Sequence, residues 1–158
     1  LHLRINPIGL PIARELNALW HSALAEFPPQ AGGLPYHDCF VAEYDGYWYA
    51  VAIWSGPVAR HLNDGSTYEL RRFAIAPSAP KNTASRMLAV MRRHIRKTRP
   101  DIKRLVSYQL LDRHQGTIYK ANGWTAEYFS KGSEWDRPNR PRPVAQNAGD
   151  KMRWEVSP

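Results

Sequence analysis

The spacing of hydrophobic and polar positions divides the chain into strand-like and helix-like segments. Alternation and β-rich runs predict strands at residues 1–6, 38–45, 47–54, 68–76, 102–111, 125–130 and 151–157. Apolar residues that recur every three or four positions predict helices at residues 10–27, 83–99 and 113–124. The pair Asp45-Gly46 predicts a tight hairpin turn. The order strand, helix, three strands, helix, strand, helix, two strands (β-α-β-β-β-α-β-α-β-β) predicts an α/β (α+β) fold.

Domain organisation follows from length and from one irregular segment. A chain of 158 residues predicts a single domain over residues 1–158. Residues 136–150 are basic and rich in proline and have no periodicity, so we expect a long loop before the C-terminal strand.

Charge and composition narrow the range of expected binding partners. Lys and Arg number 22 against 14 acidic residues, and the net charge of +8 favours a polyanion such as nucleic acid or an acidic cofactor. An unspecialised basic protein is an equal alternative. We expect no membrane association, because the sequence has no long apolar run, and no export signal, because Arg4 and Pro7 interrupt the first residues. The single Cys39 excludes an internal disulfide and fits a reducing cytoplasm.

The sharpest strand-to-helix transition lies in "IAPSAPKNTASRML", residues 75–88. A helix that begins here would present unpaired N–H groups to a phosphate, with Lys81 adding a positive charge. Asn82, Thr83 or Ser85 is the candidate cap, and small residues let a ligand approach the backbone. The alternative is an ordinary capped helix.

A second segment, which contains Tyr119, Gly123 and Trp124, lies between two predicted strands and helps to interpret this turn. With the order of elements, it resembles the GNAT superfamily of acyl-CoA-dependent N-acyltransferases. The resemblance implies a mixed, mostly antiparallel sheet of about seven strands flanked by helices. It also implies that acetyl-CoA or another acyl-CoA binds along the fourth strand and the next helix, with Tyr119 near the thioester sulfur as general acid. The implied cofactor-binding residues are Phe73, Ala74, Ile75, Lys81, Asn82, Thr83, Ala84, Ser85 and Tyr119.

A closer resemblance covers residues 69–124 and points to the Mom-type DNA-modification proteins of bacteriophages. The matching residues are Leu70, Arg72, Lys81, Asn82, Ser85, Ser107, Tyr108, Asp112, His114, Gly116, Ile118, Tyr119 and Ala121. This family is a divergent GNAT branch, and the resemblance implies transfer of a small acyl-derived group to the N6 amine of adenine in DNA. Such a modification protects phage DNA from restriction, so DNA is the expected substrate and the bacterial cytoplasm the expected location.

Modifying an adenine amine in a duplex requires a base pocket, a proton acceptor and contacts to phosphate. The candidate catalytic residues besides Tyr119 are His37, Asp112 and His114. The candidate DNA-binding residues are Arg60, Arg72, Arg137, Arg140, Arg142, Tyr36 and Trp48. Each has a plainer alternative, such as a solvent-facing histidine, a solvated loop or an aromatic residue of the core.

Three questions stay open at the level of sequence. His37, Asp38 and Cys39 are adjacent on a predicted strand and point to alternate faces, so we predict no metal site there and leave a metal requirement undecided. The oligomeric state, monomer or homodimer, is also undecided. Two alternative functions remain, namely a GNAT N-acetyltransferase acting on a small amine or protein lysine, and a catalytically lapsed GNAT-like domain that binds nucleic acid.

Overall fold

The computed structural model describes residues 2–21, 24–27, 37–111, 115–131 and 149–158. The elements are β1 (Arg4–Ile8), α1 (Leu10–Trp20), β2 (His37–Tyr44), β3 (Tyr47–Ser55), the 3-10 helix η2 (Arg60–Leu62), β4 (Thr67–Ile75), α2 (Thr83–Thr98), β5 (Arg104–Leu110), α3 (Thr117–Ala121), β6 (Thr125–Ser130) and β7 (Lys151–Val156). Apart from η2, which was not predicted, their order is the one that the hydrophobic pattern predicts.

The described strands form one seven-stranded sheet in the order β1-β2-β3-β4-β5-β7-β6. Every neighbouring pair is antiparallel except β4 and β5, which are parallel. The predicted mixed, mostly antiparallel α/β sheet is therefore confirmed. The hairpin between β2 and β3 turns at Asp45 and Gly46, both with positive φ, as the Asp-Gly signal predicts.

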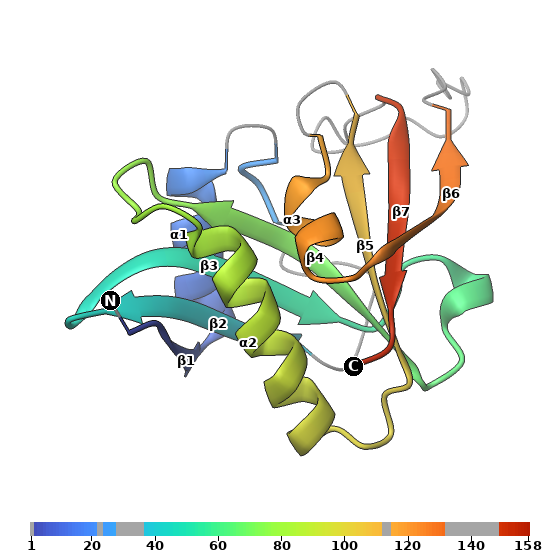
Figure 1. Ribbon diagram of the computed structural model, residues 1–158, viewed down its shortest axis with the longest axis horizontal. Helices are drawn as coiled ribbons and strands as arrows, with labels where there is room; N and C mark the ends of the chain where they lie inside the picture. The colour runs from blue at the N-terminus through green and yellow to red at the C-terminus, as the bar shows by residue number, and fades with distance from the viewer. Residues whose placement is uncertain (1, 22–23, 28–36, 112–114, 132–148) are drawn as a thin grey trace.

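Helices cover both faces of this sheet. Figure 1 shows α2 in front of the sheet and α1 behind it, with α3 beside the divergence of β4 and β5. The apolar stripe of α2 is buried against the front face, and each of its large side chains contributes roughly 1.5–3 kcal/mol. These buried side chains are Met87, Leu88, Met91 and Ile95. A second core, around Phe27 and Ile53, lies under α1.

The first helix is shorter than the sequence predicts. It ends at Trp20 instead of Phe27. Asn17 is fully buried, and its side-chain amide donates hydrogen bonds to the carbonyls of Leu24 and Ala25, which fold back toward the helix. The prediction over residues 10–27 was wrong at this end because the apolar spacing continues although the chain turns.

The two central strands separate along their length. β4 and β5 pair in register only from Thr67–Arg104 to Leu70–Ser107, although β4 continues to Ile75 and β5 to Leu110. Their C-terminal halves therefore diverge, and α3 lies beside this opening (Figure 1). Within the described ranges, no helix is long and apolar enough to cross a membrane.

Candidate functional site

The opening between β4 and β5 contains a cavity of about 350 Å³, here called the central cavity. Its walls are residues 70–73 of β4, residues 107–110 of β5 and residues 115–119 leading into α3, with His21 and Leu24 at the α1 side. Both faces of the sheet thus contribute to one space. A cavity that passes between two strands allows one substrate to meet another that enters from the opposite side.

The hydroxyl groups of Tyr119 and Ser107 meet in the wall of this cavity, 2.8 Å apart. The Tyr119 ring is stacked on Trp154 and edge-on to Trp124, so its position is fixed by aromatic packing. Burial raises the pKa of Tyr119, while the hydrogen bond with Ser107 lowers it in part. The phenol is therefore protonated at neutral pH and can donate a proton.

Gly116 makes the approach of α3 to the sheet possible. It has φ of +71° immediately before α3, a conformation that favours glycine. A Cβ placed on it would lie 2.6 Å from Cζ2 of Trp154 and 2.8 Å from Oε1 of Gln109. That Gln109 oxygen accepts a 2.7 Å hydrogen bond from the Trp154 indole. A glycine is thus required where the backbone passes over the Gln109–Trp154 pair.

A second hollow of about 500 Å³, here called the α2 groove, adjoins the central cavity. Residues 75–77 and 82–85 line it, and Ile75, Ala84, Thr117 and Ile118 line both spaces. Asn82, at the N-cap of α2, has φ of +65° and makes no side-chain cap. Thr83 and Ser85 donate their hydroxyls to the carbonyls of Pro80 and Asn82. The N–H of Thr83 donates to the carbonyl of Pro80, so the N–H groups of Ala84 and Ser85 are those of the first turn that stay open to an anion in the groove.

The remaining predicted cofactor residues lie at different places around these spaces. Phe73 and Ile75 line the central cavity, whereas Ala74 is buried in the core under α1. Lys81 is exposed just before α2 and is not among the residues that line either space.

Two arginines on β4 form the α1-side wall of the central cavity. The pairing of β3 with β4 joins Ile53 to Arg72 and Trp54 to Leu70, so Arg71 is an extra residue, a β-bulge. The bulge shifts the alternation of side chains, and both guanidinium groups lie 5.3 Å from the centroid of the Phe27 ring. Two neighbouring cations thereby face the same side of the sheet.

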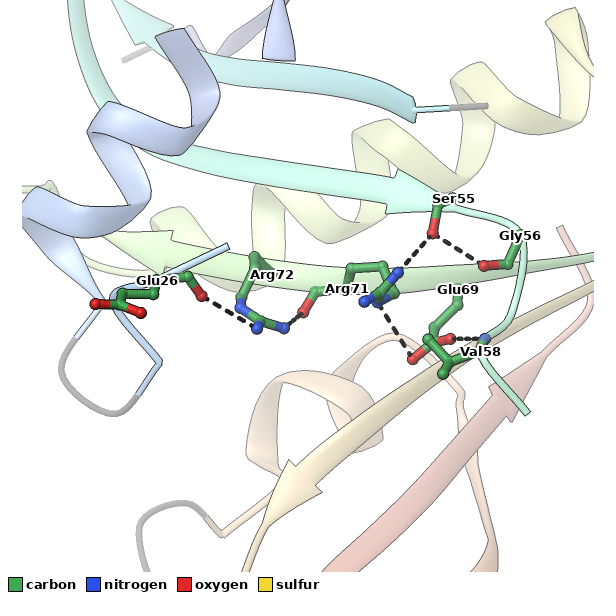
Figure 2. Close-up of polar contacts among 7 residues, drawn as sticks. All are labelled: Glu26, Ser55, Gly56, Val58, Glu69, Arg71 and Arg72. Carbon is green, nitrogen blue, oxygen red and sulfur yellow. Dashed lines mark hydrogen bonds and ion pairs between the residues drawn. The ribbon is translucent and has the colours of Figure 1, made fainter. Parts of the chain in front are cut away.

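The partners of these arginines differ (Figure 2). Arg71 donates to Ser55 Oγ at 3.3 Å and pairs with the buried Glu69 carboxylate at 4.0 Å. Arg72 donates to two backbone carbonyls, those of Arg71 and Glu26. Burial lowers the pKa of Arg71 and, together with the charge of Arg71, lowers the pKa of Arg72 to about 10. Both therefore remain charged at neutral pH, and burial raises the pKa of Glu69.

His37 lies at the start of β2, beside this arginine pair. Its ring is edge-on to Phe27, with 5.8 Å between centroids, and its Nε2 is buried with no hydrogen-bond partner in the described part of the chain. Burial, and then the positive charge of Arg71, lower the pKa of His37. His37 is thus neutral at pH 7 and is not among the residues that line the central cavity.

The other predicted site residues fall into two groups. Arg60 is exposed on η2, which follows the end of β3, whereas Trp48 is 40% exposed near the start of β3. The remaining candidates lie outside the described residues, and they are Tyr36, Asp112, His114, Arg137, Arg140 and Arg142. Over the ranges that the structure describes, no three His, Cys, Asp or Glu side chains gather in a group that could hold a metal ion.

Sequence reasoning assigned no role to Ser107, Glu69 or Gln109. All three are buried polar residues on β4 and β5. Their burial is known only from the structure, and the sequence does not distinguish them from the partly exposed polar residues of the same strands.

Comparison with solved structures shows the fold that these features belong to. A GNAT family acetyltransferase from Elizabethkingia anophelis with acetyl-CoA bound aligns with a TM-score of 0.68 and 16% identity, covering 98% of this chain and 97% of the other. An acetyltransferase from Bacillus subtilis in complex with CoA aligns with a TM-score of 0.69 and 13% identity, covering 99% of each chain. An IAA acetyltransferase from Bacillus cereus gives 0.68 and 13%, again over 99% of each chain. The chain has the GNAT fold.

Comparison by sequence identifies the branch within this fold. No curated protein matches the chain. The model of the Mom protein family matches residues 47–143, which include β3, β4, α2, β5 and Tyr119. The match spans more than half of the chain and contains residues 69–124, which carry the resemblance to Mom-type proteins. On this evidence, the chain belongs to the Mom protein family, built on a GNAT fold.

Proposed function

We propose that the protein is an acyl-CoA-dependent transferase that adds a small acyl-derived group to the N6 amine of adenine in DNA. The observation that carries the proposal is the continuity of the α2 groove with the central cavity, which joins the N-terminus of α2 to the Tyr119–Ser107 pair. Membership in the Mom family supports DNA as the substrate.

The residues around the α2 groove fit an acyl-CoA. The uncapped first turn of α2 suits a pyrophosphate, and the small residues Ala84 and Ser85 leave the backbone accessible. The diverging edge of β4 leaves backbone groups without a β5 partner beyond Leu70, which suits the amides of a pantetheine arm. Among solved structures with the same fold, the Elizabethkingia anophelis protein has acetyl-CoA bound and the Bacillus subtilis protein is in complex with CoA. An acyl-CoA would supply an activated thioester carbonyl.

The chemical step needs a proton donor and a proton acceptor. The adenine amine attacks the thioester carbonyl, an N–C bond forms and the C–S bond breaks. Tyr119 gives its proton to the departing sulfur, and Ser107 is placed to stabilise the phenolate oxygen by donating to it. The amine must lose one proton, and neutral His37 on the α1 side is the acceptor that we assign, through a water molecule because it does not line the cavity.

The test is mass spectrometry of nucleosides from DNA of a bacterium that expresses this chain. We expect a heavier deoxyadenosine with the wild type and none with Tyr119→Phe. Tyr47→Phe is the matched control, because Tyr47 is 69% exposed on the hairpin. Unmodified DNA with well-expressed wild type would overturn the adenine assignment. Release of thiol from acetyl-CoA with amine acceptors would then indicate an N-acetyltransferase acting on small molecules or protein lysine.

A further inference from the structure

The arginine pair on β4 carries a positive charge that the described residues around it do not balance. Arg71 and Arg72 contribute two positive charges, and the buried Glu69 contributes at most one negative charge. No carboxylate of the described residues forms an ion pair with Arg72, and in Figure 2 the carboxylate of Glu26 points away from it. A buried charge without a counter-charge is costly, because the protein interior solvates ions poorly.

The hydrogen bonds that Arg72 makes with described residues do not use all of its donors. Its two terminal nitrogens donate to backbone carbonyls, and its Nε is buried with no partner in the described part of the chain. An arginine that served only to hold the fold would be expected to engage its full set of donors. Arg72 also lines the central cavity, so the residue with this unsatisfied donor is part of the wall of that space.

We propose that Arg71 and Arg72 form a subsite that binds the oxyanion group, carboxylate or phosphate, of the substrate that meets the acyl donor in the central cavity. A guanidinium offers parallel N–H groups that match the two oxygens of such an anion. The bulge at Arg71 is the device that brings two guanidinium groups to one side of the strand, over the Phe27 ring. Glu69 restrains Arg71 and competes with the incoming anion.

The inference rests on this geometry and not on the acceptor proposed above. If the acceptor is adenine in DNA, the oxyanion is the phosphate of the extruded nucleotide. If the acceptor is a small molecule, the oxyanion is a carboxylate or phosphate that the molecule carries. Both kinds of acceptor present an oxyanion to the guanidinium groups, and the choice of probe anion distinguishes them.

The experiment follows thermal unfolding of the full chain while sodium phosphate or sodium acetate replaces sodium chloride at constant ionic strength. We expect a saturable rise in Tm of the wild type, because a ligand that binds only the folded state stabilises it. Arg72→Gln should lose this rise, with an apparent affinity weakened by about tenfold or more. Arg93→Gln is the matched control, because Arg93 is an exposed cation on α2. Ser85→Asp places a negative charge in the α2 groove, which disfavours anion binding there. A rise in Tm that persists in this variant therefore does not come from an anion in the groove.

Glu69→Gln keeps the test decisive if Arg72→Gln does not fold. Removing the competing carboxylate should strengthen anion binding by several-fold, a direction that a purely structural arginine pair does not predict. An unchanged anion response in Arg72→Gln or Glu69→Gln, or no response of the wild type, would overturn the subsite. Stabilisation by the dinucleoside phosphate of two deoxyadenosines but not by acetate identifies the nucleotide phosphate as the natural group. The reverse identifies a carboxylate.

Discussion

The phenol of Tyr119 and the hydroxyl of Ser107 lie 2.8 Å apart, one on α3 and the other at the last paired position of β5 with β4. The contact therefore joins the short helix to the point where the sheet opens. Burial raises the pKa of the Tyr119 phenol, which is stacked on Trp154, and the hydrogen bond with Ser107 lowers it in part. The two residues form one hydrogen-bonded pair.

Removing the Ser107 hydroxyl should slow transfer and also destabilise the protein. The hydrogen bond lowers the pKa of Tyr119, so Ser107→Ala raises that pKa further and weakens the phenol as an acid. We expect about a tenfold lower rate of thiol release from acyl-CoA. The unpaired phenol should cost about 1–2 kcal/mol in the free energy of unfolding, measured with urea. An unchanged rate would show that Ser107 does not tune Tyr119.

Gly116→Ala should be one of the most destabilising alanine substitutions at a glycine of this chain. The new Cβ would meet Trp154 and Gln109 at 2.6 and 2.8 Å, in addition to the strain of φ at +71°. We expect a loss of about 2–4 kcal/mol in the free energy of unfolding by urea. Gly65→Ala is the matched control, because Gly65 has φ of +79° and open space around its Cβ position. Equal losses in the two variants would show that the contact with Trp154 is relieved at no cost.

An acidic residue in the first turn of α2 should change stability and ligand binding in opposite directions. Ser85→Asp places a carboxylate at the positive end of the helix dipole, which should stabilise the fold by about 0.3–1 kcal/mol. The same charge lies in the α2 groove, so we expect the affinity for CoA to fall by about tenfold, measured by isothermal titration calorimetry. A CoA affinity equal to that of the wild type would place the pyrophosphate elsewhere.

Most of the fold could be predicted from the sequence because each element carries a local signal. The stripe Met87, Leu88, Met91 and Ile95 indicates α2, and Asp45-Gly46 indicates the hairpin. The end of α1 could not be predicted, because the apolar spacing runs on to Phe27 while Asn17 binds the returning backbone. That contact depends on tertiary structure, which periodicity does not record.

The candidate site was predicted in outline only. The turn before α2 and Tyr119 were identified from local pattern and resemblance, and the structure places both beside connected hollows. The joint orientation of Arg71 and Arg72 could not be predicted, because strict alternation puts neighbouring side chains on opposite faces. A bulge depends on the register with β3, and only the paired strands reveal it.

Stability at mildly acidic pH should depend on His37. Its pKa in the folded state lies below the ordinary value of 6.5, because burial and Arg71 disfavour the imidazolium. Between these two values the unfolded chain binds more protons than the folded one, so the free energy of unfolding falls as the pH falls below about 6.5. His37→Gln removes this proton uptake, and the slope of Tm against pH from 7 to 5 should become shallower. His2→Gln, at an exposed site, is the control and should keep the wild-type slope. A wild-type slope in His37→Gln would show that other groups determine the acid response and that His37 is not the neutral imidazole assigned as proton acceptor.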